Sequence, residues 1–189
     1  DNFVKVSNRI AKELSASNNS GVLWANQFDN IANYLGHYNT TGQEIWMQTQ
    51  GNIDGFVCSS GTGGTIAGVS KALKEKNKDI KVFLCDPKGS ALNNYIKTKE
   101  LIIDGTSITE GIGSSRVTSN FSEAIIDDSY SIGDTEALNI LFTLMEKEGL
   151  FLGTSSGINV AGAIRLAKEL GKGKTIITVL CDKSDRYHS

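Results

Sequence analysis

A glycine-rich stretch in the first half of the chain is its strongest chemical signal. It reads Ser59-Ser60-Gly61-Thr62-Gly63-Gly64-Thr65 and lies between an apolar, strand-like run and a helical pattern. Glycines let backbone N–H groups approach an anion closely, and the start of the following helix adds unpaired donors and a positive dipole end. The hydroxyls of Thr62 and Thr65 add further donors. The sequence therefore predicts an anion cradle in this loop.

The cradle is uncharged, and this narrows the kind of anion. No lysine is present in the loop, so it is not a G-x-x-x-x-G-K phosphate loop, and it does not match G-x-G-x-x-G cleanly. Amides and hydroxyls without a cation suit one phosphate monoester held permanently, as in a cofactor. A glycine turn without a ligand stays open as the alternative on this pattern alone. Two further glycine clusters, at 110–113 and 153–157, favour backbone packed around a flat ligand.

The elements that must position these loops alternate between helical and strand-like patterns. Such alternation predicts an α/β fold with a largely parallel sheet and helices on both faces, and it puts binding loops at the carboxyl ends of the strands. Thr41 with Glu44 predicts a capping box, Asp134 a helix N-cap, and Pro87 a turn just past a strand. We expect helices at 4–14, 41–49, 65–75, 90–99, 134–148 and 158–170, and strands at 21–28, 53–58, 81–85, 124–132, 150–152 and 175–181.

Composition excludes several classes of protein. The chain has 189 residues, 39% of them hydrophobic and 21% charged, with a net charge of −2. These values suit one globular domain, or one domain with a piece of another, and they predict neither disorder nor a nucleic-acid partner. No apolar run approaches the roughly 18 residues of a membrane span, and the N-terminus has no signal-peptide pattern. The abrupt start suggests a fragment.

The cysteines and histidines predict structural rather than chemical roles. The spacing of Cys58, Cys85 and Cys181 matches neither a disulfide framework nor a zinc site, so no metal is expected. Each cysteine follows an apolar run, which predicts three buried thiols near strand ends and suits a reducing compartment. His37 and His188 have no partner at catalytic spacing and are predicted to be surface or loop residues.

Several residue blocks, taken in order, resemble fold-type II pyridoxal-phosphate enzymes, and most closely the cysteine synthase (O-acetylserine sulfhydrylase) family. The resemblance covers essentially the whole chain. It is highly specific for the family. It is less specific in separating the cysteine synthase branch from the related cystathionine β-synthase branch. The matching blocks are Asn26-Gln27-Phe28, Thr40 to Trp46, Gly61 to Gly68, Glu110 to Gly113, Ser155-Ser156-Gly157 and Asp185-Arg186-Tyr187.

The resemblance implies site residues and domains. It implies that residues 1–34 are a remnant of an N-terminal small domain and that 35–189 form the domain that binds pyridoxal 5′-phosphate. In this family the cofactor supports replacement of the acetate of O-acetylserine by sulfide to give cysteine. It further implies a homodimer, in the cytoplasm or the mitochondrion. The implied residues are Gly61, Thr62, Gly63, Gly64 and Thr65 for the cofactor phosphate, and Gly111, Ile112 and Gly113 beside the amino-acid substrate.

Two departures from the family pattern bear on activity. The motif with the Schiff-base lysine is absent, so no catalytic residue is assigned and the chain alone is expected to be inactive; the match is to the C-terminal two-thirds of the family. The family also has a serine, three residues before the arginine at Arg186, whose hydroxyl meets the pyridine nitrogen. Lys183 stands there and is predicted to contact the cofactor. Alternatively, Lys183 points to solvent and a water or Ser184 takes this role.

Three functions stay open. The first is cysteine synthesis from O-acetylserine and sulfide in the complete protein. The second is β-replacement on serine with homocysteine, as in cystathionine β-synthase. The third is a non-catalytic homologue that binds a partner or ligand, which the lysine at 183 motivates.

Overall fold

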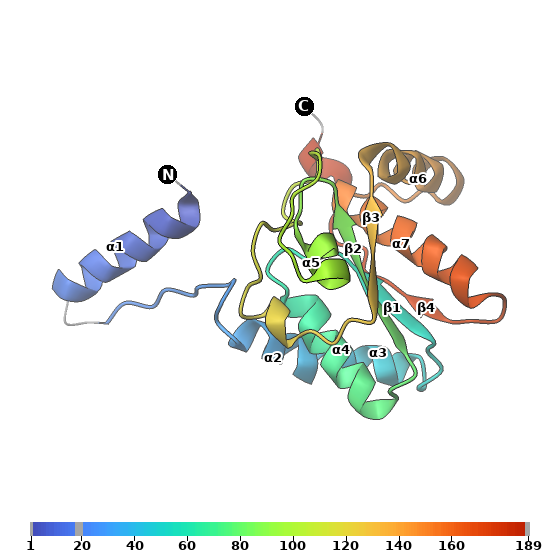
Figure 1. Ribbon diagram of the computed structural model, residues 1–189, viewed down its shortest axis with the longest axis horizontal. Coiled ribbons are helices and arrows are strands. Elements are labelled where there is room, and N and C mark those ends of the chain that lie inside the picture. Colours follow the sequence, from blue (N-terminus) through green and yellow to red (C-terminus); the bar gives the residue numbers. More distant parts are fainter. Residues whose placement is uncertain (1, 18–20, 188–189) are drawn as a thin grey trace.

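The computed structural model describes residues 2–17 and 21–187. Its centre is a four-stranded sheet in the order β3-β2-β1-β4, in which every neighbouring pair of strands is parallel (Figure 1). The apolar runs of the sequence supply these strands, because a parallel sheet is buried on both faces. The strands are β1 (Gly55–Cys58), β2 (Lys81–Pro87), β3 (Asp128–Ile132) and β4 (Ile176–Ile177). This confirms the predicted α/β fold with a largely parallel sheet.

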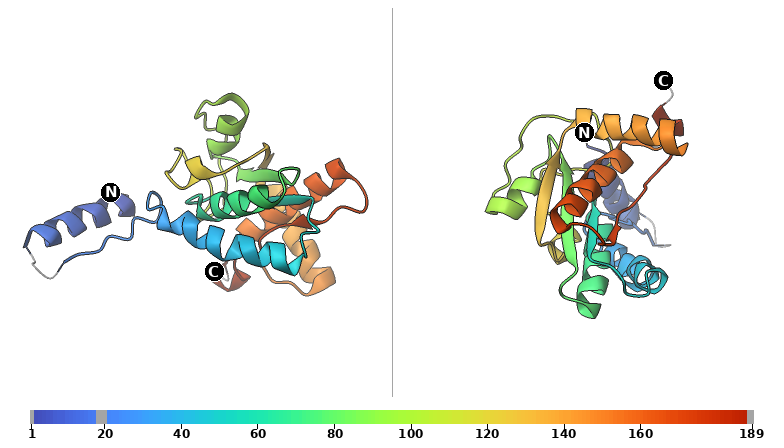
Figure 2. Two further views of the ribbon diagram at one scale, coloured as in Figure 1. Left: turned by 90° about the horizontal axis from the view of Figure 1, so that it is seen from below. Right: turned by 90° about the vertical axis from the view of Figure 1, so that its right-hand side faces the viewer.

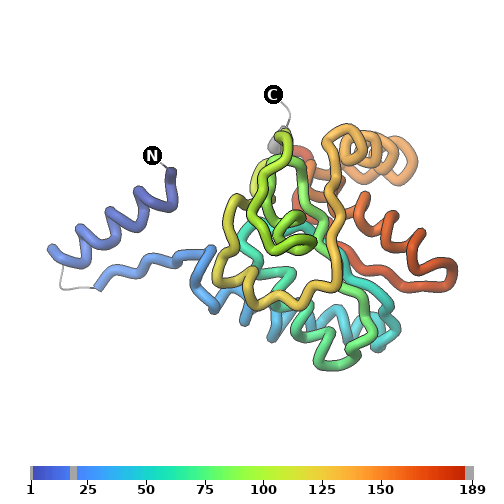
Figure 3. Tube along the Cα trace, viewed as in Figure 1, coloured from blue at the N-terminus to red at the C-terminus, as the bar shows by residue number. Residues whose placement is uncertain are grey.

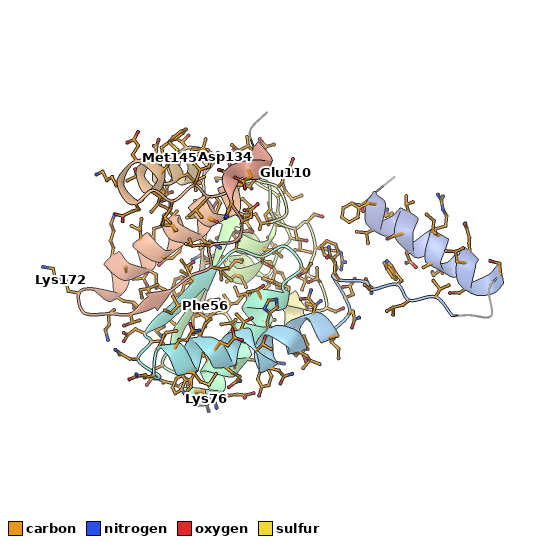
Figure 4. All side chains as sticks on the ribbon, turned by 180° about the vertical axis from the view of Figure 1, so that it is seen from behind. Phe56, Lys76, Glu110, Asp134, Met145 and Lys172 are labelled. Carbon is orange, nitrogen blue, oxygen red and sulfur yellow. The ribbon has the colours of Figure 1, made fainter. Side chains whose placement is uncertain are left out.

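Alternate residues of the strands face two separate cores, as the side-chain period of a strand requires. Phe56 and Leu84 face a core that includes the apolar side of α4 (Gly64–Lys76). Val57 and Cys85 face the opposite core, which includes α7 (Thr154–Leu170). Helices therefore cover both faces of the sheet (Figure 2), and Phe56 lies in the middle of the molecule among their side chains (Figure 4).

The remaining helices extend these two layers. On the α4 side, α2 (Ala32–Asn39) and α3 (Thr41–Gln48) pack against α4, and α5 (Leu92–Thr98) packs against β2 and β3. On the other side, α6 (Asp134–Glu148) packs against α7. A long connection without regular structure runs from α5 to a short 3-10 helix at Phe121–Glu123, and a second 3-10 helix covers Ser184–Tyr187.

The first helix stands apart from this body. Helix α1 (Phe3–Ser17) buries none of its residues and forms an arm beside the body, and residues 21–26, which lead toward α2, have no regular structure (Figure 3). Its amphipathic pattern was expected from the sequence, but the face that the pattern would bury is partly open, with Ile10 46% and Leu14 48% exposed. The domain boundary at residue 34 remains a prediction. In the structure this position lies within α2, which begins at Ala32 and packs against the body.

Most predicted elements are present, with several corrections. Residues 21–28 and 150–152 form no strand, and α2 was missed; Leu152 makes only an isolated bridge with Lys183. The predicted last strand, 175–181, is reduced to the two residues of β4, and the predicted strand at 124–132 begins only at Asp128. Pro87 ends β2 instead of following it.

Both predicted helix caps are also wrong. Thr40 is the N-cap of α3 and Thr41 its first residue, and the Thr40 hydroxyl donates to Gly36 O of α2 at 2.8 Å instead of capping α3, so no capping box forms there. Likewise Gly133 is the N-cap of α6, and Asp134 lies in its first turn. There the Asp134 carboxylate accepts hydrogen bonds from Ser107 Oγ at 2.5 Å and Ile108 N at 3.0 Å, so it anchors a distant loop instead of its own helix. Among the described residues, no helix is both long and apolar enough to cross a membrane.

Candidate cofactor site

The glycine-rich loop lies where the sequence placed it, between the end of β1 and the start of α4. Gly63 is the N-cap of α4 and has a φ of +89°, a left-handed conformation that glycine adopts without strain. The hydroxyl of Thr62 accepts a hydrogen bond from Gly64 N at 3.3 Å. The loop thus turns sharply and directs the first turn of a 13-residue helix toward the carboxyl end of the sheet.

Two of the loop glycines are needed because other backbone lies against them. A Cβ on Gly61 would be 2.3 Å from the carbonyl oxygen of Gly111, and one on Gly63 would be 2.5 Å from the backbone nitrogen of Phe121. The segment that leads into the 3-10 helix at Phe121 therefore packs directly over the cradle; we call residues 107–120 the mouth loop. Gly113 N donates to Ser60 O at 2.8 Å and Thr118 Oγ1 donates to Thr62 O at 2.6 Å, which fixes the mouth loop in this position.

A cavity of about 810 Å³ opens between the cradle, the mouth loop and the start of α7. Its volume is within the usual range for sites that bind small molecules. Glu110, at its rim, lies at the same end of the molecule as Asp134 (Figure 4). The lining residues are Gln27, Cys58, Ser59, Gly61, Thr62, Thr65, Ile108, Glu110, Gly111, Ile112, Ser155, Asn159, Val179, Cys181 and Asp182.

The predicted site residues divide into those that line this cavity and those behind it. Gly61, Thr62 and Thr65 line it from the cradle, and Gly111 and Ile112 line it from the mouth loop. Gly63 and Gly64 form the buried turn behind them. Gly113 faces the other side of the mouth loop, where a Cβ would be 3.1 Å from Pro87 Cγ. The structure thus brings together residues from both predicted sets.

Lys183 and Ser184 occupy contrasting positions beside the cavity. Lys183 is exposed and bridges Leu152 in antiparallel fashion. Ser184 is 8% exposed, and its buried Oγ has no hydrogen-bond partner among the described residues. Neither residue lines the cavity, whereas Cys181 and Asp182 just before them do. Both Lys183 and Ser184 therefore remain candidates to contact the part of a ligand that lies away from the phosphate cradle.

Asn159 lines the cavity and was missed in the sequence. It lies in the first half of α7, is 1% exposed, and accepts a hydrogen bond from Ser59 N at 2.7 Å. Its amide donates to Val179 O at 2.8 Å and contacts Cys181 Sγ at 3.4 Å. An amide within an otherwise apolar and small-residue helix face was the available signal, because a buried polar side chain needs partners. Asn159 connects the cradle to the segment after β4.

His37 also differs from its prediction as a surface or loop residue. It lies on α2, half-buried, with Nε2 3.2 Å from Thr65 Oγ1 and Nδ1 3.0 Å from Thr41 Oγ1. Burial lowers the pKa of its imidazole, so the ring is neutral at neutral pH and can accept from one hydroxyl while it donates to the other. His37 therefore orients a hydroxyl of the cradle. His188 lies outside the described residues.

The cysteines correct a further prediction. Cys58 and Cys85 are buried, and burial raises the pKa of both thiols, which keeps them protonated and unreactive. Cys181, by contrast, is exposed at the cavity. In the described part of the chain, no group of three or more His, Cys, Asp and Glu residues is placed to hold a metal ion.

The residues present fit a phosphorylated cofactor. The cradle is built so closely from glycine backbone that a Cβ has no room at Gly61 or Gly63. Its donors are amides and hydroxyls at a helix N-terminus, the donor set that suits a phosphate monoester. The buried hydroxyl oxygens of Ser60 and Ser184 have no protein partner among the described residues, although neither residue lines the cavity itself.

Comparison with known proteins agrees with this fit. The family model "Pyridoxal-phosphate dependent enzyme" matches residues 2–182. The chain belongs to this family. Cysteine synthase 1 of Neurospora crassa is 46% identical in an alignment of 170 positions that covers 87% of the chain and 45% of the relative. A cysteine synthase of Dictyostelium discoideum is 44% identical over 176 residues, covering 88% of the chain and 47% of that protein.

A solved structure gives the same fold assignment. The O-acetylserine dependent cystathionine beta-synthase of Helicobacter pylori superposes with a TM-score of 0.83 at 33% identity, over 95% of the chain and 56% of that structure. The chain therefore has the fold of this pyridoxal-phosphate enzyme family. It spans about half the length of the curated relatives it matches.

Proposed function

We propose that the chain is the cofactor-holding part of an enzyme that makes cysteine by replacing the acetate of O-acetylserine with sulfide. The observation that carries this proposal is the cavity in which the glycine cradle at the α4 N-terminus meets the mouth loop. It supports binding of pyridoxal 5′-phosphate, which supplies the electron withdrawal that weakens bonds at the α-carbon of an amino acid. Two relatives named cysteine synthase support the choice of reaction.

In this proposal each set of residues has a binding role. Amides of Gly61, Gly63 and Gly64 and the hydroxyls of Thr62 and Thr65 hold the phosphate. Gly111, Ile112 and Gly113 place the mouth loop beside the amino acid and limit the entry of water. No residue of the chain takes the role of the Schiff-base lysine, so the chain by itself binds the cofactor without turnover. The amino-acid reaction is a property of the complete enzyme.

The first experiment measures cofactor binding to the chain. Titration with pyridoxal 5′-phosphate, followed by ³¹P NMR, is expected to shift the phosphate resonance, and Thr62→Val with Thr65→Val is expected to weaken binding at least tenfold. Absence of any shift at millimolar cofactor would refute the cofactor role. Cysteine formation is then assayed in protein expressed from the full open reading frame, with O-acetylserine and sulfide.

The same assay separates the two other functions. Homocysteine in place of sulfide, with either serine or O-acetylserine, tests cystathionine β-synthase activity, which the name of the Helicobacter pylori structure favours as the second candidate. Turnover with homocysteine but not sulfide would decide for that reaction. Cofactor binding without turnover by either route would decide for the non-catalytic homologue.

The ring end of the cofactor has two proposed contacts, Lys183 and Ser184. The exposed position of Lys183 and the buried, unpartnered hydroxyl of Ser184 make their substitutions informative. If Ser184 contacts the ring, Ser184→Ala weakens cofactor binding severalfold and Lys183→Ala does not; if Lys183 contacts it, the effects are reversed. Equal affinities in both variants would exclude both contacts.

We also propose a homodimer in a reducing compartment, either the cytoplasm or the mitochondrion. The absence of disulfides among Cys58, Cys85 and Cys181 supports a reducing compartment. Light scattering of the purified chain tests the dimer, and a monomer at micromolar concentration would refute it for this chain. Fluorescent tagging of the full open reading frame tests the compartment.

A further inference from the structure

The turn at residues 26–30 brings Gln27 to the wall of the cavity. The side chain of Asp29, in the same turn, lies outside the cavity lining and binds the mouth loop. Asp29 Oδ1 accepts hydrogen bonds from Arg116 Nη1 at 3.0 Å and from Ser119 N at 2.9 Å. Its Oδ2 accepts from Arg116 Nη2 at 2.8 Å. The two parallel bonds form a bidentate pair, the stronger and more directional form of an arginine–carboxylate contact. Arg116 and Ser119 belong to the mouth loop, so Asp29 joins the turn to that loop.

A buried amide makes the second connection between the same segments. Asn120 is fully buried, and its Nδ2 donates to the carbonyl oxygens of Gln27 at 3.1 Å and Phe28 at 2.8 Å. Its Oδ1 accepts from Tyr34 N at 3.2 Å, at the start of α2. The side-chain NH₂ group of Asn120 therefore holds the carbonyl groups of Gln27 and Phe28, and its side-chain oxygen holds the start of α2.

A third connection links the turn to the phosphate cradle. Asn33 Nδ2 donates to Gln27 O at 2.7 Å and to Thr62 Oγ1 at 3.0 Å. The carbonyl of Gln27 thus accepts from two amides, one on α2 and one at the end of the mouth loop. Through them the position of the Gln27 backbone is fixed relative to Thr62, which lines the same cavity.

The backbone of the turn needs this support. Asn26, immediately before Gln27, has a φ of +45°, in the left-handed region that few residues other than glycine adopt, asparagine more readily than most. Such a conformation persists where surrounding contacts over-determine it. The segment before it leads to the open arm α1 and offers little support, because α1 buries none of its residues. Support comes from the mouth loop, through Asp29–Arg116 and Asn120, and from Asn33 of α2.

We propose that Asp29, Arg116 and Asn120 form a clasp that positions Gln27 for the polar groups of the amino-acid ligand. An amide side chain can donate to a carboxylate and accept from an ammonium, so its orientation decides how the amino acid lies beside the cradle. Asp29 and Arg116 do not line the cavity and act through Gln27; they are positioning residues. The identity of the ligand as an amino acid rests on the proposed function, whereas the clasp itself rests on the contacts above.

The test uses the chain with a cofactor analogue that cannot react with amines. Protein saturated with 4′-deoxypyridoxine 5′-phosphate is titrated with O-acetyl-L-serine at pH 6.5, and both affinities are measured by calorimetry. Asp29→Asn and Arg116→Ala are expected to weaken O-acetylserine binding at least tenfold while the affinity for the phosphate analogue changes less than threefold. Arg116→Lys, which keeps one of the two hydrogen bonds, is expected to restore part of the loss.

Asp54 provides a matched control. Its carboxylate also accepts from a cation, Lys174 Nζ at 2.9 Å, and from a backbone amide, Thr175 N at 2.9 Å, but it lies at the opposite end of β1. Asp54→Asn is expected to leave both affinities within threefold of the wild type. An equal loss in Asp54→Asn would show that the effect of Asp29→Asn is general destabilisation and would overturn the clasp.

A second readout keeps the clasp separate from the proposed function. In ¹⁵N NMR spectra the side-chain amide of Gln27 is expected to be ordered in the wild type and to lose its heteronuclear NOE in Asp29→Asn. If the wild type binds no O-acetylserine but this difference is present, the proposed function fails and the clasp stands. An equally ordered Gln27 amide in Asp29→Asn, or unchanged O-acetylserine affinity, refutes the clasp. Should Asp29→Asn not fold, Ser119→Ala removes one 3.2 Å hydrogen bond to Asp29 and is read in the same way.

Discussion

Gly61 shows how a single missing side chain sets the geometry of the site. Its φ does not require glycine, yet the space where a Cβ would lie is filled by the carbonyl oxygen of Gly111, 2.3 Å away. The contact brings the mouth loop close enough for Gly113 N to reach Ser60 O. Glycine is therefore required by the close approach of two backbones and not by the turn itself.

Gly61→Ala is expected to push the mouth loop away from the cradle. Because the obstacle is backbone, the alanine cannot be accommodated by a rotamer change, and we expect the dissociation constant for pyridoxal 5′-phosphate to rise at least tenfold in a ³¹P NMR titration. Gly133→Ala is the control, since a Cβ there meets nothing within 4 Å. Unchanged affinity in Gly61→Ala would show that the two loops separate without cost.

A buried carboxyl at the end of β2 gives the chain a pH dependence. Asp86 is fully buried, and burial raises its pKa from 3.8 to about 6. One oxygen accepts from Asn93 N at 2.7 Å, whereas Oδ1 has no partner among the described residues. An acid whose pKa rises on folding takes up a proton on folding between the two values. The free energy of unfolding therefore falls as the pH rises from about 4 to about 6, by roughly 1–3 kcal/mol.

Asp86→Asn is expected to abolish this fall in the free energy of unfolding between about pH 4 and pH 6. The amide keeps an acceptor for Asn93 N, so the variant should be more stable than the wild type at pH 7 and closer to it at pH 4.5, as measured by urea unfolding at both values. Comparison with the wild type removes the contribution of His37, whose lowered pKa acts with the opposite sign near pH 6. A constant difference across the range would mean that Asp86 stays charged in the folded chain.

At the scale of elements, the approach of α7 to the sheet depends on small residues. A Cβ on Gly162 would lie 1.9 Å from Cys85 Sγ and 3.2 Å from Val57 Cγ2. All three residues are buried, so the cysteine sulfur has little space into which it can move. The same helix carries Asn159 to the cradle, and its distance from the sheet therefore affects the site as well as the core.

Gly162→Ala is expected to lower the free energy of unfolding by roughly 1–3 kcal/mol, the usual cost of overpacking. Thermal and urea unfolding measure this loss. Adding Cys85→Ala removes the sulfur that the new methyl group meets and should recover part of the stability. Gly36→Ala, where a Cβ meets nothing within 4 Å, should instead be neutral or slightly stabilising.

The elements also show which features local sequence can predict. Both ends of α6 agree with the prediction, because a left-handed glycine at 149 ends it and acidic residues begin it. Residues 21–28 have strand-like character but no partner strand, and pairing is a property of the whole sheet. The same limit explains β4, which pairs with β1 over two residues only.

The site follows the same rule. The cradle was predictable because its glycines, hydroxyls and helix start are consecutive in the sequence. Gln27, Asn159 and His37 reach the cradle across 28 or more residues, through His37–Thr65, Asn33–Thr62 and Ser59–Asn159. No local pattern marks such contacts. A buried amide in an apolar helix was a usable signal at Asn159, and Gln27 belongs to a block that carries the family resemblance, but neither indicates which residues it contacts.

For the molecule as a whole, the arm is the least supported part. Helix α1 has 15 residues, none buried, and helices of this length are marginal alone in water. The hydrogen bond from Trp24 Nε1 to Ser7 Oγ, at 3.2 Å, joins it only to its own connecting segment. The body has its own two cores and does not depend on this contact.

Removal of residues 1–21 is expected to leave the midpoint of thermal unfolding of the body within about 2 °C. Amides of α1 should exchange with solvent within seconds in the intact chain, whereas those of α7 should be protected for hours, as hydrogen–deuterium exchange would show. Strong protection of α1 would mean that its apolar face is covered in solution. A large fall in the midpoint would show that the arm supports the body.

The contacts that close the site also determine when it can form. Ser59 and Asn159 are 100 residues apart, Thr178 Oγ1 donates to Val57 O across 121 residues, and the Asp29–Arg116 pair spans 87. Contacts between distant residues require long loops to close and form late in folding. During synthesis the cradle therefore leaves the ribosome well before Asn159 is translated. Until then, Ser59 N lacks the hydrogen bond to Asn159 that completes the site. The contacts that close the site can form only after residues 159 and 178 have been made.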